Sequence, residues 1–191
     1  MQSGTDMVPP LHAFATQRLS VQEWSSWLED PKWKARLISD LGELLTERVL
    51  IDLPPSMATE NNDAAIENWI IRQSQEGTTY VVQLAGADRI IGLLILAQSP
   101  ERDDKTIHLG YLLAEDVWGH GYASELVLGL TAALAKGASI RLCGGVSSNN
   151  PASARVLKKA GFRRLDENTP QNTDFYILDV GWSASPERSQ K

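Results

Sequence analysis

The chain has 191 residues, of which 42% are hydrophobic, and its formal net charge is −6. This length and apolar content suffice for one globular domain with a sizeable core. The acidic balance, with no basic run to offset it, argues against a nucleic-acid partner. The single cysteine, Cys143, excludes an intramolecular disulfide and leaves no Cys/His spacing for a metal, so no metal is expected. The longest apolar run, Ile90–Ala97, is too short to cross a bilayer and no signal-peptide layout precedes it, so we expect a cytoplasmic protein without a membrane partner.

The first part of the chain is predicted to be mainly helical. Residues 1–12 are polar and contain Pro9-Pro10, which indicates a flexible arm, and residues 13–182 are expected to form the single domain. Phe14–Ser20 is predicted as a short strand. Apolar residues then recur at helical spacing over residues 21–30, 32–51 and 64–76. Pro31 is expected to interrupt the first helix, and Pro54-Pro55 to end the second before an exposed loop.

From Thr78 onwards the apolar pattern changes to that of strands, with two further helices between them. The predicted strands are residues 78–84, 89–98, 106–113, 139–146 and 175–180. A helix is predicted over residues 123–134, and another begins at Pro151 with Asn150 as its N-cap and Gly161 just past its end. A polar tail follows from Ser183. This order predicts an α+β fold with a mixed α/β sheet, mostly antiparallel and flanked by helices.

The segment "DVWGHGYASELV" (Asp116–Val127) places two glycines directly before a helix. The first amides of a helix have no intrahelical partner, and the helix dipole favours a negative charge there. Gly119 and Gly121 would let those amides approach a phosphate closely, although a tight strand–helix turn is the simpler interpretation of the glycines alone. A P-loop is excluded because Gly-Lys-Ser/Thr is absent. A dinucleotide fingerprint is excluded because no acidic residue follows the next strand.

Two motifs resemble those of the GNAT N-acetyltransferases. Trp118-x-x-Gly121-x-Ala123 is similar to the acetyl-CoA pyrophosphate loop, in the Trp-Gly-x-Gly-Tyr-Ala form of the ribosomal-protein (Rim-like) branch. "NPASARVLKKAGF", from Asn150 to Phe162, resembles that branch's second motif at unchanged spacing. The early "TQRL" and the hairpin "YVVQLAGADRIIG" match in order, so the resemblance covers roughly residues 14–180.

The resemblance implies a GNAT-like fold in which acetyl-CoA lies between two splayed central strands. It implies that the main chain around Tyr111–Leu113 holds the pantetheine arm, with an amide near Leu112 or Leu113 facing the thioester oxygen. The remaining residues implied to bind acetyl-CoA are Trp118, Gly119, His120, Gly121, Tyr122, Ala123, Asn150 and Ser153. No metal and no covalent enzyme intermediate are implied, so Cys143 is expected to be a small buried strand residue.

Two residues are candidates for the proton chemistry. His108 occupies the position at which the Rim-like pattern often has a glutamate base, and a neutral imidazole can accept a proton near neutral pH. The alternative is a partly buried strand histidine. The tyrosine acid that many members carry seven residues after the asparagine is replaced by Leu157, which leaves Ser153 or water to donate to the leaving sulfur. Ser153 as an ordinary first-turn residue is the alternative.

The expected reaction is direct attack by a primary amine on the thioester of acetyl-CoA in a ternary complex. The acceptor could be a protein N-terminus, a polyamine, an amino acid or an aminoglycoside-type antibiotic. A non-catalytic CoA-binding module is the remaining alternative. The helical segment Val21–Ile70 is expected to form one wall of the acceptor site, with most of its tryptophans in the core, and a homodimer is compatible with this interpretation.

Overall fold

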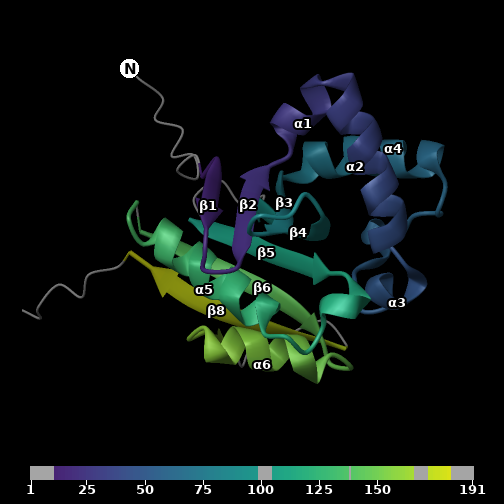
Figure 1. The fold of residues 1–191 in the computed structure, drawn as a ribbon. Coiled ribbons are helices and arrows are strands. Elements are labelled where there is room, and N and C mark those ends of the chain that lie inside the picture. The colour runs from purple at the N-terminus through teal and green to yellow at the C-terminus, as the bar shows by residue number, and fades with distance from the viewer. Residues whose placement is uncertain (1–10, 99–104, 138, 166–171, 182–191) are drawn as a thin grey trace, which may run out of the picture.

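A computed structural model describes residues 11–98, 105–137, 139–165 and 172–181 (Figure 1). Over these residues, eight strands form one sheet in the order β1-β2-β3-β4-β5-β6-β8-β7. Each neighbouring pair is antiparallel except β5 and β6, which run parallel. The predicted α+β fold, with its mixed and mostly antiparallel sheet, is therefore confirmed.

Helices cover both faces of this sheet. The strands are β1 (Ala13–Ala15), β2 (Leu19–Glu23), β3 (Thr78–Leu84), β4 (Ile90–Gln98), β5 (Thr106–Leu113), β6 (Ile140–Ser147), β7 (Arg163–Arg164) and β8 (Thr173–Val180). The helices are α1 (Ser25–Glu29), α2 (Pro31–Leu44), α3 (Glu47–Leu50), α4 (Asp63–Glu76), α5 (Tyr122–Leu134) and α6 (Pro151–Lys159), with short 3-10 turns η1 (Pro55–Met57) and η2 (Glu115–Val117). The helices α2 and α4 contact β4 and β3, whereas α5 and α6 contact each other and lie on the opposite side (Figure 1).

The N-terminal strand prediction is wrong in its extent. The segment predicted as one strand over Phe14–Ser20 is a hairpin of β1 and β2, and β2 continues through Val21 to Glu23 instead of starting a helix. Leu19 and Val21 are buried while the residues between and after them are exposed, which is the strand period. The spacing of Val21, Trp24 and Leu28 resembles that of a helical stripe, which is why the sequence predicts a helix from Val21. In the structure the helix begins only at Ser25.

The long helix predicted over residues 32–51 is two helices. Asp30 caps α2 through hydrogen bonds from the amides of Lys32 and Trp33, so Pro31 occupies the first helical position and starts this helix rather than interrupting it. The chain leaves α2 at Leu45. Thr46 then caps α3 by accepting a hydrogen bond from the amide of Val49 at 3.3 Å.

The second half agrees closely with its prediction. Strands β3 and β5 have the predicted bounds, and α5 and α6 begin within one residue of the predicted positions. β8 begins earlier, at Thr173, and the two-residue β7 was not predicted. The predicted tail from residue 183, most of the N-terminal arm and most of the polar turn over residues 99–105 lie outside the described residues.

Three of the four tryptophans of the N-terminal helices lie in the core, as predicted. Trp24 and Trp27 are buried, and Trp69 is fully buried with its indole N–H donating to the carbonyl of Met57 at 3.0 Å. Trp33 is 39% exposed and packs its ring on Trp27. Cys143 is buried. Within the part of the chain that the structure describes, no helix is both long and apolar enough to cross a bilayer.

The glycines of the central strands provide a test of this packing. A Cβ on Gly92 of β4 would lie 2.4 Å from the carbonyl oxygen of Leu112, which is backbone and cannot move aside cheaply. A Cβ on Gly110 of β5 would have its nearest neighbour at 3.9 Å. We expect Gly92→Ala to lower the free energy of unfolding by about 1–3 kcal/mol, the usual cost of overpacking a core. Denaturant titration measures it.

The control is Gly110→Ala, which we expect to stay within about 0.5 kcal/mol of the wild type because it removes nothing and meets no backbone. Equal stability of the two variants would contradict the close approach of β4 to β5.

Candidate active site

The strands β5 and β6 pair over only part of their length. Their parallel register runs from Thr106 opposite Arg141 to His108 opposite Cys143, and then stops. β5 nevertheless stays paired with β4 up to Leu113, and β6 stays paired with β8 along its whole length. A gap therefore opens between β5 and β6 after His108, with the edge of β5 facing it.

The register of β5 against β4 determines which backbone groups of β5 face the gap. The amide of Ala114 donates to the carbonyl of Ile91 at 2.8 Å, so Ala114 points toward β4. Because backbone groups alternate sides along a strand, Leu112 also points toward β4, whereas Tyr111 and Leu113 point into the gap. Of the two amides expected near the thioester, the geometry favours that of Leu113.

The indole of Trp118 is hydrogen-bonded to the last residue of β5. Its N–H donates to the carbonyl of Leu113 at 2.7 Å, which satisfies that carbonyl and leaves the Leu113 amide available. The side chain of Trp118 remains 41% exposed. The first residue of the loop motif thus connects the end of β5 to the start of α5.

The glycines of the loop adopt the backbone conformation that glycine favours. Gly119 has φ +78° and Gly121 has φ +81°. Gly121 is the N-cap of α5 and supplies no side-chain cap. Among the described residues, no acceptor is found for the amides of Tyr122, Ala123 and Ser124. The helix therefore begins with unsatisfied donors that an anion could bind.

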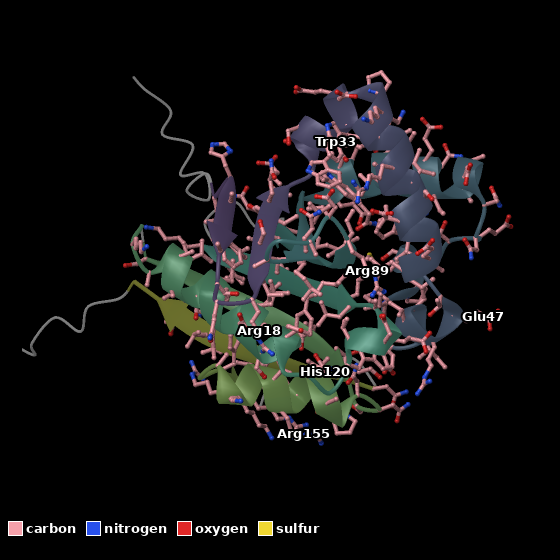
Figure 2. All side chains as sticks on the ribbon, viewed as in Figure 1. Arg18, Trp33, Glu47, Arg89, His120 and Arg155 are labelled. Carbon is pink, nitrogen blue, oxygen red and sulfur yellow. The ribbon has the colours of Figure 1, made fainter. Side chains whose placement is uncertain are left out.

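An arginine from the first hairpin lies against this loop. The Nε of Arg18 donates to Glu125 Oε2 at 2.6 Å, and its Nη1 donates to the carbonyl of His120 at 3.1 Å (Figure 2). Its guanidinium also lies 4.4 Å from the ring centroid of Tyr122. Partial burial would raise the pKa of Glu125, but hydrogen bonds from Thr16 and Arg18 hold the pKa below its usual value. The sequence reasoning missed this pair, whose only sequence signal was the "TQRL" motif.

Further ion pairs hold the turn that joins β5 to α5. Asp116 receives two hydrogen bonds from Arg89, at 2.7 and 2.9 Å, which lower its pKa. Glu115 accepts from the hydroxyl of Thr46 at 2.5 Å and from Arg48 at 3.3 Å. The turn is thereby connected both to β4 and to the start of α3. These contacts were also missed, because they join segments far apart in the sequence.

The second motif brings three of the predicted residues together. The side chain of Asn150 accepts from the amide of Ser153 at 2.9 Å, so its predicted role as N-cap of α6 is confirmed. The hydroxyl of Ser153 lies 2.8 Å from that of Tyr111 on β5. Burial raises the pKa of the Tyr111 phenol, although the hydrogen bond with Ser153 opposes the rise. This pair lies on the face of β5 that carries α6.

His108 lies on the other face of β5. Strand alternation puts its half-buried side chain on the face that Gly110 shares, opposite to Tyr111. No hydrogen bond from His108 to another described residue is found. The two candidates for proton chemistry, His108 and Ser153, are thus separated by the backbone of β5.

The glycines of β6 serve the packing of α6. The side chain of Leu157 is buried, and its Cδ1 lies 2.8 Å from where a Cβ on Gly144 would be. Gly145 faces Phe175 across the strand pair, and the register of β6 with β8 continues through both glycines without a bulge. Position 157, where the resemblance implies a tyrosine in many members, is part of the core here.

A cavity lies beside the start of α5 and extends away from the gap. It has a volume of about 840 Å³ and runs along α5 beneath the first hairpin, from Arg18 and Gly121 to Lys136 and Lys159. Gly121 and Ser124 at the start of α5 line this cavity, whereas no residue of β5 or β6 does. Within the described residues, no cluster of three or more His, Cys, Asp or Glu could hold a metal ion.

Comparisons with known proteins agree with this geometry. A family model described as an acetyltransferase (GNAT) domain matches residues 8–163. No curated protein sequence matches the chain significantly. A probable GNAT-family acetyltransferase from Chromobacterium violaceum ATCC 12472 has a similar structure, with a TM-score of 0.67 and 19% identity over 94% of this chain and 92% of that one.

Two similar structures are ribosomal-protein acetyltransferases. RimL, the ribosomal L7/L12 α-N-protein acetyltransferase in complex with coenzyme A, has a TM-score of 0.58 and 18% identity, over 88% of this chain and 98% of that one. The acetyltransferase from Salmonella typhimurium that modifies the N-terminal serine of ribosomal protein L7/L12 has a TM-score of 0.61 and 17% identity, over 86% and 96%. At these identities the likeness concerns the fold. The family match spans most of the chain, and the protein belongs to the acetyltransferase (GNAT) domain family of acyltransferase enzymes.

Proposed function

We propose that this acyltransferase moves the acetyl group of acetyl-CoA to a primary amine by direct attack in a ternary complex. The observation that carries the proposal is the gap between β5 and β6, which ends at the glycine-rich start of α5. A ligand with an extended amide arm and a diphosphate at its end has the chemistry that this arrangement would bind. The Rim-like branch is part of the proposal and rests on the two sequence motifs.

The loop is proposed to hold the diphosphate through backbone groups. The free amides of Tyr122, Ala123 and Ser124 point out of the N-terminus of α5, where the helix dipole adds to their attraction for an anion. Gly119 has no neighbour within 4 Å of a Cβ position, which leaves space for phosphate oxygens beside the backbone. Arg18 adds a positive charge close to Gly121.

The arm of acetyl-CoA is proposed to add to the open edge of β5. The backbone of Tyr111 faces the gap and can exchange hydrogen bonds with the amides of the arm, as an added strand would. The amide of Leu113 points away from β4 into the same gap, so it can donate to the thioester carbonyl oxygen. A donor placed there stabilises the negative charge that develops on this oxygen during attack.

The amine is proposed to approach from the face that carries His108. Gly110, the next residue on that face, leaves room beside the imidazole. Neutral histidine can accept a proton from the attacking amine near neutral pH. On the other face, Ser153 can donate a hydrogen bond to the leaving sulfur. Its amide is fixed by Asn150, which also lies at the gap and is proposed to contact the arm.

The acceptor is proposed to be a protein N-terminus or a small amine. Both RimL and the Salmonella typhimurium enzyme act on ribosomal protein L7/L12, and both have this fold. The helices α1 to α4 and the exposed residues between Pro54 and Asp63 form the surface on the His108 side and are proposed to wall the acceptor site.

Substitution of a loop glycine tests the diphosphate site. We expect Gly121→Val to abolish the rise in melting temperature that acetyl-CoA produces, because a valine Cβ would occupy the space over the amides and would strain the positive φ. Thermal-shift measurements with and without acetyl-CoA give the result.

Gly86→Val is the matched control. Gly86, in the β3–β4 turn, has φ +78° and no neighbour within 4 Å of a Cβ position, so the control carries the same backbone strain away from the loop. It should keep the acetyl-CoA response. Stabilisation of the wild type by NAD or ATP as strongly as by acetyl-CoA would contradict the assignment of the loop as an acetyl-CoA site.

Release of free thiol from acetyl-CoA across a panel of N-terminal peptides, polyamines, amino acids and aminoglycosides tests the activity itself. The wild type should release thiol with at least one class, and the productive class identifies the acceptor. His108→Ala should lower the turnover rate by about 10²-fold or more at neutral pH, the usual cost of losing a general base. Acetyl-CoA binding should be retained.

His12→Ala serves as the control because His12 is an exposed histidine of the N-terminal region. A wild type that binds acetyl-CoA but releases no thiol with any amine would favour a CoA-binding module. Turnover by His108→Ala within a few-fold of the wild type would exclude His108 as the base.

A further inference from the structure

The hydroxyl groups of Tyr111 and Ser153 form a pair at the edge of the β5–β6 gap. They come from β5, which borders the gap, and from α6, and their oxygens are 2.8 Å apart. The backbone of Tyr111 faces the gap, and Ser153 lies in the first turn of α6. The pair is thus placed beside the path proposed for the thioester, on the face opposite His108.

Position 157 of α6 supplies no hydroxyl to this region. Leu157 is 1% exposed and its Cδ1 covers the backbone of Gly144 in β6. A phenol on the same side of the sheet comes instead from β5, through Tyr111. The function that a tyrosine on α6 would perform therefore has a different structural source in this chain.

We propose that Tyr111 is a positioning residue that donates its hydrogen bond to Ser153 and thereby directs the Ser153 hydroxyl at the sulfur of CoA. This inference rests on the proposed function. Each hydroxyl has one proton to donate. When the phenol of Tyr111 donates to Ser153 Oγ, the serine proton is left for a third atom, and the chain of two donors is polarised toward it.

The surroundings of the pair fix the orientation of Ser153 and the protonation of Tyr111. The amide of Ser153 is already bound by Asn150, so the backbone of this residue is fixed and its side-chain torsion is set by Tyr111. Burial raises the pKa of Tyr111, which keeps the phenol protonated and therefore a donor throughout the neutral range.

Neither the Tyr111 nor the Ser153 hydroxyl loses its proton in the acetyl-transfer step. The amine nitrogen forms a bond to the acetyl carbon, and the C–S bond breaks with its electron pair on sulfur. The proton lost by the amine passes through His108 or water to the solvent, and the thiolate regains a proton after release. While the thiolate is bound, Ser153 donates to it, because a charge-assisted hydrogen bond is stronger than a neutral one.

The direct test is the ionisation of the CoA thiol bound to the enzyme, followed by the ultraviolet absorption of the thiolate as the pH is raised. An alkyl thiol such as cysteine ionises with a pKa of about 8.5. The wild type should lower the pKa of bound CoA, and Tyr111→Phe and Ser153→Ala should each return it upwards by about one pH unit, which matches the strength of one hydrogen bond to a charged group. Because CoA alone is the probe, the readout needs no acceptor.

The kinetic test uses the same variants. Tyr111→Phe should lower kcat by roughly tenfold with the KM for acetyl-CoA unchanged, since the Ser153 hydroxyl is then no longer directed at the sulfur and its hydrogen bond to the thiolate is weakened. Adding Tyr111→Phe to Ser153→Ala should lower kcat by less than about a further threefold, since Tyr111 acts through Ser153. Tyr80→Phe is the matched control, because Tyr80 is also a buried tyrosine but lies on β3.

The outcomes separate this inference from the proposed function. A wild type that does not bind CoA would overturn the proposed function. A bound thiol whose pKa is the same in the wild type and in Tyr111→Phe, whatever its value in Ser153→Ala, would overturn the Tyr111 inference alone. An equal loss of kcat in Tyr80→Phe, or fully additive losses in the double variant, would also overturn it. If Tyr111→Phe does not fold, an unchanged thiol pKa in Ser153→Ala still overturns the inference, because Tyr111 is proposed to act only through Ser153.

Discussion

The parting of β5 from β6 after His108 and Cys143 is the constraint on which the rest of the site depends. Buried backbone groups in the middle of a sheet normally find partners, and leaving them unpaired is costly. The two strands part although each stays paired on its far side: β5 with β4 up to Leu113, and β6 with β8 along its length. The open edge of β5 therefore remains able to accept an external strand-like arm.

The contacts around the gap position the helix that follows it. Trp118 attaches the loop to the end of β5, and Arg89 and Thr46 hold the intervening turn through Asp116 and Glu115. Arg18 approaches from the first hairpin and connects the loop carbonyl of His120 to the first turn of α5. The first amides of α5 thus remain free to bind a ligand, while the loop before them is held by hydrogen bonds to other elements.

The features that the sequence predicts depend on local patterns, whereas these contacts join segments far apart in the sequence. The strands β3 to β5, the helices α5 and α6, and the cap at Asn150 could be predicted because period, glycine and capping residues all lie within the element concerned. The hairpin of β1 and β2 was missed because the spacing of Val21 and Trp24 is that of a helix, whereas only Leu19 and Val21 show the strand period.

The arrangement of the site depends on long-range pairing that no local pattern contains. Arg18 contacts Glu125 across 107 positions and Tyr111 contacts Ser153 across 42, and no local pattern in the sequence connects the two members of either pair. The choice between Leu112 and Leu113 as the amide donor requires the register of β5 against β4, which the sequence alone leaves open.

Residue-resolved amide hydrogen exchange, with and without acetyl-CoA, tests the central claim most directly. Binding in the gap should slow exchange at Tyr111 and Leu113, and at the first amides of α5 from Tyr122 to Ser124, because each of these gains an acceptor. Leu112, which already points toward β4, should change little. Protection confined to the later part of the cavity along α5, from Leu128 to Ala133, or unchanged exchange at Leu113, would contradict the claim that the open edge of β5 binds the acetyl donor.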